Sequence, residues 1–96
     1  MNKLLLAAST ALLTFAPLAA QASTRNTVIA TTAVMYCNYQ MGHMTIREAS
    51  EYGTKYLLDR GISDAVVDSI MSSSTFNDEV VSAIETGGGC EKITAK

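Results

Sequence analysis

The sequence predicts an all-α protein: a small bundle of three to four short helices, closed by one disulfide bond and preceded by a cleaved signal peptide. Three observations support this fold class. The N-terminal segment is apolar and ends in a small-x-small motif. Apolar residues recur at helical spacing between capping residues in the rest of the chain. The only two cysteines are far apart in the sequence, as expected for a covalent link across a small exported domain.

Residues 1–22 have the layout of a secretory signal peptide. Lys3 supplies the N-terminal positive charge, and residues 4–20 are all apolar or small. Residues 20–22, Ala-Gln-Ala, then form the cleavage site, which makes Ser23 the mature N-terminus. An uncleaved membrane anchor is the alternative, because the stretch is just long enough to span a bilayer, although hydroxyl residues and a proline dilute it.

Residues 23–96 are predicted to form one small exported helical domain. They contain six basic and nine acidic residues, a net charge of −3, scattered along the chain without a basic patch. Nucleic acid is therefore not an expected partner. With no cysteine at the cleavage site and no twin-arginine pair, we expect export by the general secretory route. The mature protein would be periplasmic or secreted and would have no stable membrane anchor.

The first helix is predicted over Val28–Met41, with Gly42 as its stop. Its apolar residues fall at helical spacing, but the stretch TVIATTAV is rich in β-branched residues. Such residues suit a strand at least as well. The sequence therefore leaves open whether this segment is helix or partly strand.

The second helix carries the clearest signals. Thr45 and Glu48 have the spacing of a capping box at its start, and Gly61 followed by Ile62 predicts a Schellman ending after Arg60. A glycine in mid-helix, Gly53, predicts close approach of another helix. The expected apolar stripe comprises Ile46, Ala49, Gly53, Tyr56 and Leu57.

Two further helices follow. Ser63 is the predicted N-cap of a helix from Asp64 to about Met71. After a linker at 72–75, a fourth helix runs from about Phe76 to Thr86, with Gly87 at the left-handed C′ position. Because the connections are short, neighbouring helices should pack antiparallel. The expected apolar faces are Val66, Val67, Ile70 and Met71 on the third helix, and Phe76, Val80, Val81 and Ile84 on the fourth.

The two cysteines are predicted to pair. The glycines at 87–89 end the fourth helix and permit a sharp reversal, so that Cys90 can reach Cys37 near the end of the first helix. A domain of this size is marginally stable without such a link. A reactive thiol is the alternative, but there is no C-x-x-C motif and no cationic cluster that would stabilise a thiolate.

The segment MYCNYQMGHM, residues 35–44, contains three methionines and the only histidine. Thioether and imidazole ligands suit Cu(I), and Met41, His43 and Met44 could converge on one ion around the glycine turn. The alternative is structural: methionine fills irregular gaps in small cores, and His43 is then a solvated loop residue.

The tyrosines predict an interaction surface at the edge between the first and second helices. Its residues are amphipathic, and tyrosine is enriched at interfaces. They could equally form the outer layer of the core, with their hydroxyls in water. The residues of this predicted surface are Tyr36, Tyr39, His43, Tyr52 and Tyr56.

No catalytic constellation stands out. The chain has a single histidine and no G-x-S-x-G motif, and the carboxylate pair Asp64 and Asp68 falls on a polar helix face. The sequence therefore predicts an exported protein that has no enzymatic activity and no cofactor. This protein is expected to bind an unknown protein or small ligand. A periplasmic copper-binding or copper-buffering protein is the alternative. The layout resembles small periplasmic helical proteins, a class that includes acid-stress chaperones and toxin-immunity proteins, in size and organisation alone.

Overall fold

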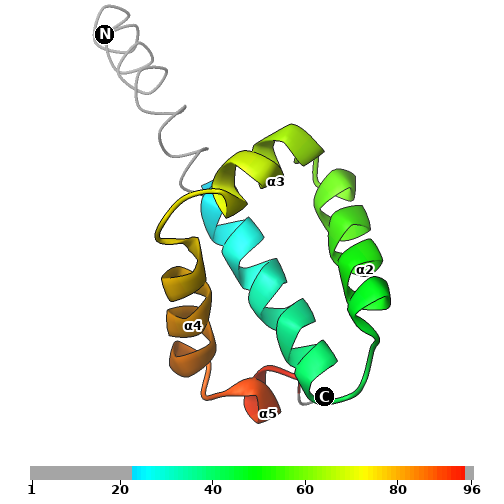
Figure 1. The fold of residues 1–96 in the computed structure, drawn as a ribbon, viewed down its shortest axis with the longest axis vertical. Coiled ribbons are helices and arrows are strands. Elements are labelled where there is room, and N and C mark those ends of the chain that lie inside the picture. The colour runs from blue at the N-terminus through cyan, green and yellow to red at the C-terminus, as the bar shows by residue number, and fades with distance from the viewer. Residues whose placement is uncertain (1–22, 95–96) are drawn as a thin grey trace, which may run out of the picture.

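The computed structural model describes residues 23–94, and within that range it is helical without strands. Its elements are a first helix over residues 23–40, then α2 (Ile46–Asp59), α3 (Asp64–Met71), α4 (Phe76–Thr86) and α5 (Cys90–Ile93). The first helix lies between α2 and α4, α3 crosses one end of the bundle, and α5 lies at the other end (Figure 1). The predicted signal peptide, residues 1–22, lies outside the described residues.

The first helix forms in spite of its β-branched residues, so the strand alternative is wrong for this segment. Its core side chains are almost completely covered: Val28 and Cys37 are fully buried, and Ala33 is nearly so. The hydroxyl of Thr32 donates to the carbonyl oxygen of Val28 at 2.8 Å, within the same helix. Burial on a central helix outweighs the weak intrinsic preference of valine, isoleucine and threonine for strands.

The hydrophobic core gathers around this central helix, and it is smaller than the sequence predicted. The buried cluster comprises Val28, Ile29, Ala33, Leu57, Ile62, Phe76 and Val80, with Val67, Ile70, Ala83 and Ile84 packed against it. Five residues expected to be buried are instead exposed: Ile46, Tyr56, Val66, Met71 and Val81.

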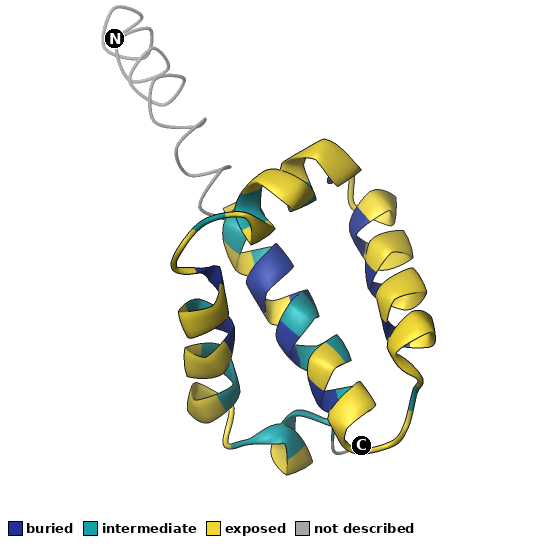
Figure 2. Ribbon diagram, in the orientation of Figure 1, coloured by how far each residue is buried: buried dark blue, intermediate teal, exposed yellow. Residues whose placement is uncertain are grey.

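The reason for these errors is the narrow contact arc of each outer helix. In α2 the buried residues are Ala49, Gly53 and Leu57, which are four apart and lie along one edge. The outward face of α2 is exposed along its whole length (Figure 2). No residue of α3 is fully buried. The outer helices therefore bury thinner stripes than their apolar periodicity suggests.

The predicted caps of α2 are confirmed. The Glu48 N–H donates to the Thr45 hydroxyl at 3.1 Å, and the Thr45 N–H donates to the Glu48 carboxylate at 3.0 Å. At the other end, the Ile62 N–H donates to the Leu57 carbonyl at 3.0 Å, which is the defining bond of a Schellman ending. Ile62 and Leu57 both belong to the core cluster.

α4 ends at Thr86 as predicted, but the left-handed residue of the triple glycine comes one position later than predicted. Gly87 is right-handed, with φ of −77°, and the left-handed position falls on Gly88, with φ of 93°. Gly89 also has a positive φ, 94°, a backbone conformation that residues other than glycine rarely adopt. This double reversal starts the short helix α5, which the sequence analysis did not predict, at Cys90.

The reversal brings Cys90 to Cys37, with their Cα atoms 5.0 Å apart and their sulfurs at disulfide distance. This Cα separation is within the range that disulfides require. The predicted pairing therefore has the geometry of a disulfide bond. It links two cysteines that are 53 positions apart in the sequence.

Arg25 connects the start of the first helix to α4 through an ion pair and hydrogen bonds, which were not predicted from the sequence. Its guanidinium donates to the Glu79 carboxylate at 2.7 Å and to the hydroxyls of Ser73 and Thr75 at 3.0 and 3.3 Å. Both charged side chains are partly covered, which makes the pair less exposed to screening than the other ion pairs of the described chain.

None of the helices in residues 23–94 combines the length and apolarity that membrane crossing requires.

Removal of the disulfide should strongly destabilise the domain. We expect the Cys37→Ala/Cys90→Ala variant to lose about 4 kcal/mol of unfolding free energy, because a loop of this length is no longer closed in the unfolded chain. Urea denaturation of the oxidised protein and the variant measures this difference. The reduced wild-type protein is the control, and it should match the variant. A loss below about 1 kcal/mol would show that the link contributes little.

The capping box should make stability depend on the ionisation of Glu48. The backbone N–H of Thr45, and then its hydroxyl, lower the pKa of Glu48 below its ordinary value of 4.5. A carboxylate with a lowered folded-state pKa stabilises the fold above its ordinary pKa, and this contribution is lost as the pH falls through the folded-state value. Wild type should therefore exceed Glu48→Gln in unfolding free energy near neutral pH, and the difference should shrink in acid. Denaturation curves across the pH series measure it, and a pH-independent difference would contradict the assignment.

Candidate functional site

An apolar groove of about 260 Å³ lies between the first helix, α2 and α3. Its rim carries four large exposed apolar side chains, with Tyr36 and Tyr39 on the first helix, Ile46 on α2 and Met71 on α3. Its deeper residues include Thr31, Ala49, Gly53 and Leu57, all of which are buried. We refer to this depression as the Tyr36–Tyr39 groove.

No charged residue lines the Tyr36–Tyr39 groove. Its polar groups are hydroxyls only, from serine, threonine and tyrosine. The rim side chains keep 40% to 62% of their surface exposed. Single exposed apolar residues are common on proteins, but a contiguous set around a depression marks a binding surface. This arrangement is the strongest candidate site in residues 23–94.

Gly53 sets how closely the walls of the groove approach each other. A Cβ atom at this position would lie 3.3 Å from the Met35 side chain and 3.8 Å from that of Thr31, both on the first helix. The predicted close approach of another helix at Gly53 is therefore confirmed. Because Gly53 has no side chain, the side chains of Met35 and Thr31 on the first helix pack directly against the backbone of α2 at the floor of the groove.

The structure brings together only part of the predicted tyrosine surface. Tyr36 and Tyr39 line the groove, and the Tyr36 hydroxyl accepts a hydrogen bond from the Gln40 amide at 2.8 Å. Tyr52 and Tyr56 are not among the lining residues. The exposed loop residue His43 does not line it either.

The separation of the tyrosines follows from the geometry of α2. At 100° per residue, Tyr52 and Tyr56 lie on one side of the buried stripe, whereas the groove residues Ser50 and Thr54 lie on the other side and Ile46 lies in line with the stripe. Tyr56 instead stacks beneath Arg60, whose guanidinium carbon lies 3.5 Å from the ring centroid. Tyr52 lies beside Glu48, Glu51 and Lys55 on the charged outer face.

The residues of the copper hypothesis lie around the turn after the first helix. Met41 and His43 are exposed, and Met44 is half-buried. Among residues 23–94, no group of three or more histidine, cysteine or acidic side chains is placed to hold a metal ion. That finding does not concern methionine ligands, so copper binding by this trio stays a prediction.

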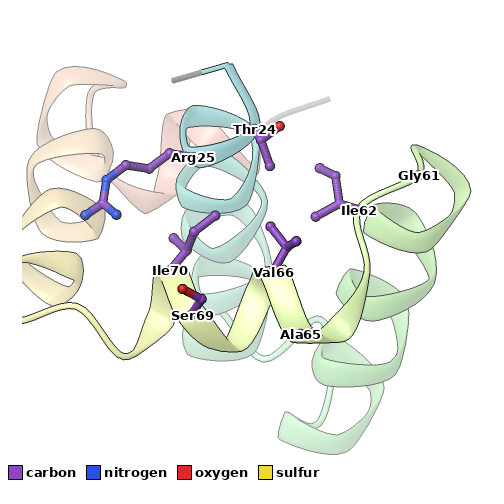
Figure 3. A pocket seen from close by; sticks show the side chains of 8 residues that line it. All are labelled: Thr24, Arg25, Gly61, Ile62, Ala65, Val66, Ser69 and Ile70. Atoms are coloured by element: carbon purple, nitrogen blue, oxygen red, sulfur yellow. The ribbon is translucent and has the colours of Figure 1, made fainter. Parts of the chain in front are cut away.

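A second, larger depression of about 720 Å³ lies between the start of the first helix and α3. Figure 3 shows Ile62, Val66 and Ile70 around it, with the Arg25 side chain directed away toward α4. It contains no aromatic residue, and its lining includes a charged side chain. The Tyr36–Tyr39 groove is the better candidate, because its lining is uncharged and includes two aromatic side chains.

No family model, curated protein or solved structure matches this chain. The case for function therefore depends on the geometry of the groove.

Proposed function

We propose that this protein is a small exported binding protein without enzymatic activity, which holds an apolar ligand or protein segment in the Tyr36–Tyr39 groove. One observation supports this above all: a concave apolar site with no charged lining residue, edged by exposed aromatic and aliphatic side chains. Sites of this composition gain affinity from the burial of apolar surface, at about 25 cal/mol per Å². Tyrosine adds rigid contact area of the kind found at binding hot spots.

The chemistry of the groove supports binding rather than catalysis. Its lining provides no imidazole, thiol, carboxylate or amine, and so no general acid, general base or activated nucleophile. The hydroxyl proton of Thr32 is already donated to the Val28 carbonyl within the helix. What remains is an apolar surface with a few hydroxyl groups, which suits recognition of an uncharged group.

Export fits the covalent design of the domain. A cysteine pair at disulfide distance is stable in an oxidising compartment and is rare in a reducing one. The small-x-small motif at residues 20–22 would place the mature N-terminus at Ser23.

The exported protein should have a defined intact mass. We expect the non-reduced mass of residues 23–96 minus two hydrogen atoms, because signal cleavage and disulfide formation both alter the chain. Native and denaturing mass spectrometry of the exported fraction measure it, with the reduced sample as control. A full-length mass with free thiols would contradict export and pairing together, and a mass carrying copper would support the alternative at Met41, His43 and Met44.

The groove should bind an uncharged apolar fluorophore. We expect N-phenyl-1-naphthylamine to bind saturably, and Tyr36→Ala and Tyr39→Ala each to weaken binding by about tenfold, because each removes part of the rim. Fluorescence titration measures the dissociation constants. Tyr52→Ala is the matched control, since Tyr52 is 65% exposed on α2 but outside the groove. Equal affinities for all three variants, or no saturable binding to wild type, would refute the proposed site.

A further inference from the structure

The Tyr36–Tyr39 groove runs between two helices and has the length of a short helix. The first helix contributes Thr32, Tyr36 and Tyr39 to it, and α2 contributes Ile46, Ser50 and Thr54. At 1.5 Å per residue, each wall is about 10 to 12 Å long, or roughly two helical turns. These two helices are joined by a short turn and run antiparallel (Figure 1). A trough of this form is the surface onto which a third helix packs its side-chain ridges.

The volume of the groove suits a few side chains of a partner protein better than a bulky small molecule. Its volume of about 260 Å³ lies just below the range of about 300 to 1,000 Å³ that is typical of small-molecule pockets. Small residues, Ala49 and Gly53, lie among its buried residues, while Val67 and Met71 of α3 close one end. The groove can therefore receive the two or three apolar side chains that a two-turn helix projects from one face.

Two aspartates of α3 precede Met71 at the end of the groove, although neither is among the lining residues. Asp64, Asp68 and Met71 are spaced i, i+4 and i+7, so the two aspartates continue the helix face on which Met71 borders the groove. Both aspartates are exposed, and neither has an ion-pair partner among the described residues. At the opposite end, Arg47 beside Ile46 is already near Glu51, 3.8 Å away. Arg60, at the C-terminal end of α2, also has no ion-pair partner among residues 23–94, but it stacks on Tyr56 outside the groove. The unmatched charge beside Met71 is therefore negative.

This charge distribution selects among possible occupants. An apolar small molecule would leave the aspartates unused. A second copy of the chain would bring another acidic surface, because residues 23–96 carry nine acidic and six basic side chains, and like charges oppose such a contact. A helix with a basic residue at one end satisfies both the neutral groove and the two aspartates that precede Met71.

We infer that the occupant is an amphipathic helix of a partner protein, with two or three uncharged apolar anchors spaced over two turns and a lysine or arginine at the end that lies over α3. This inference rests on the proposed function of the groove and adds the class of its ligand.

The test uses synthetic fluorescent peptides with the disulfide-intact protein. Each alanine-based peptide has about 15 residues, enough to form a helix, and carries leucine at positions i, i+4 and i+7. One set has lysines one turn beyond the leucines, at either the N- or the C-terminal end, and a matched set has glutamates. Fluorescence anisotropy at low and high salt gives the dissociation constants.

We expect the better lysine peptide to bind at least about tenfold more tightly than its glutamate counterpart at low salt, with the difference decreasing as salt is added. Asp64→Asn/Asp68→Asn should remove this preference, and Tyr36→Ala should weaken both peptides. Glu85→Gln on α4 is the control and should retain the preference. Asp68→Asn alone leaves the first turn of α3 intact and should halve the preference or more, so the test holds even if the double variant is unstable.

Equal binding of the lysine and glutamate peptides, or a preference that survives in Asp64→Asn/Asp68→Asn, would overturn the inference. Tyr36-dependent binding of the apolar fluorophore without binding of any peptide would also overturn it, while the proposed function would stand. Self-association of the chain in sedimentation, abolished by Tyr36→Ala, would identify a second copy as the occupant instead. Failure of both probes would refute inference and proposed function together.

Discussion

The arrangement depends on the burial of one central helix, residues 23–40, by elements on several of its faces. Val28, Ile29 and Ala33 place this helix in the core cluster, and Cys37 joins it to α5. Arg25 connects its start to α4. The three outer helices bury little of their own surface, and α3 has no fully buried residue. α3 and α4 also contact each other, but the first helix takes part in the core cluster, the disulfide and the Arg25 contact together.

The sequence could predict the features that depend on interactions between residues close together in the chain. The capping box of Thr45 and Glu48 and the Schellman ending at Gly61 depend on backbone hydrogen bonds between near neighbours, and both form as predicted. The cysteine pairing could be predicted because two cysteines allow one connectivity. Even local chemistry has limits, since three consecutive glycines offer several places for the left-handed residue, and Gly88 takes it instead of Gly87.

Burial and the groove could not be predicted from periodicity. The spacing of Ile46, Val66, Met71 and Val81 is that of core residues, yet all four are exposed because each outer helix buries only a narrow stripe. Ile46 and Met71 then become rim residues of the groove. Their assembly with Tyr36 and Tyr39 requires the relative placement of three helices, which no single segment encodes. The tyrosines were predicted as one surface, and the buried stripe of α2 divides them.

The groove and the disulfide are related because the small core supplies only limited stability. Met35 faces Gly53 of α2, whereas Cys37, two residues later and about 200° around the helix, faces α5. On the Met35 side, α2 presents the small residues Ala49 and Gly53 to the first helix and leaves Tyr36 and Tyr39 partly uncovered, which lowers the stability that the contact can supply. The covalent link on the opposite side stabilises the domain without using any of that surface. A small domain can keep an open apolar groove because its stability is supplied elsewhere.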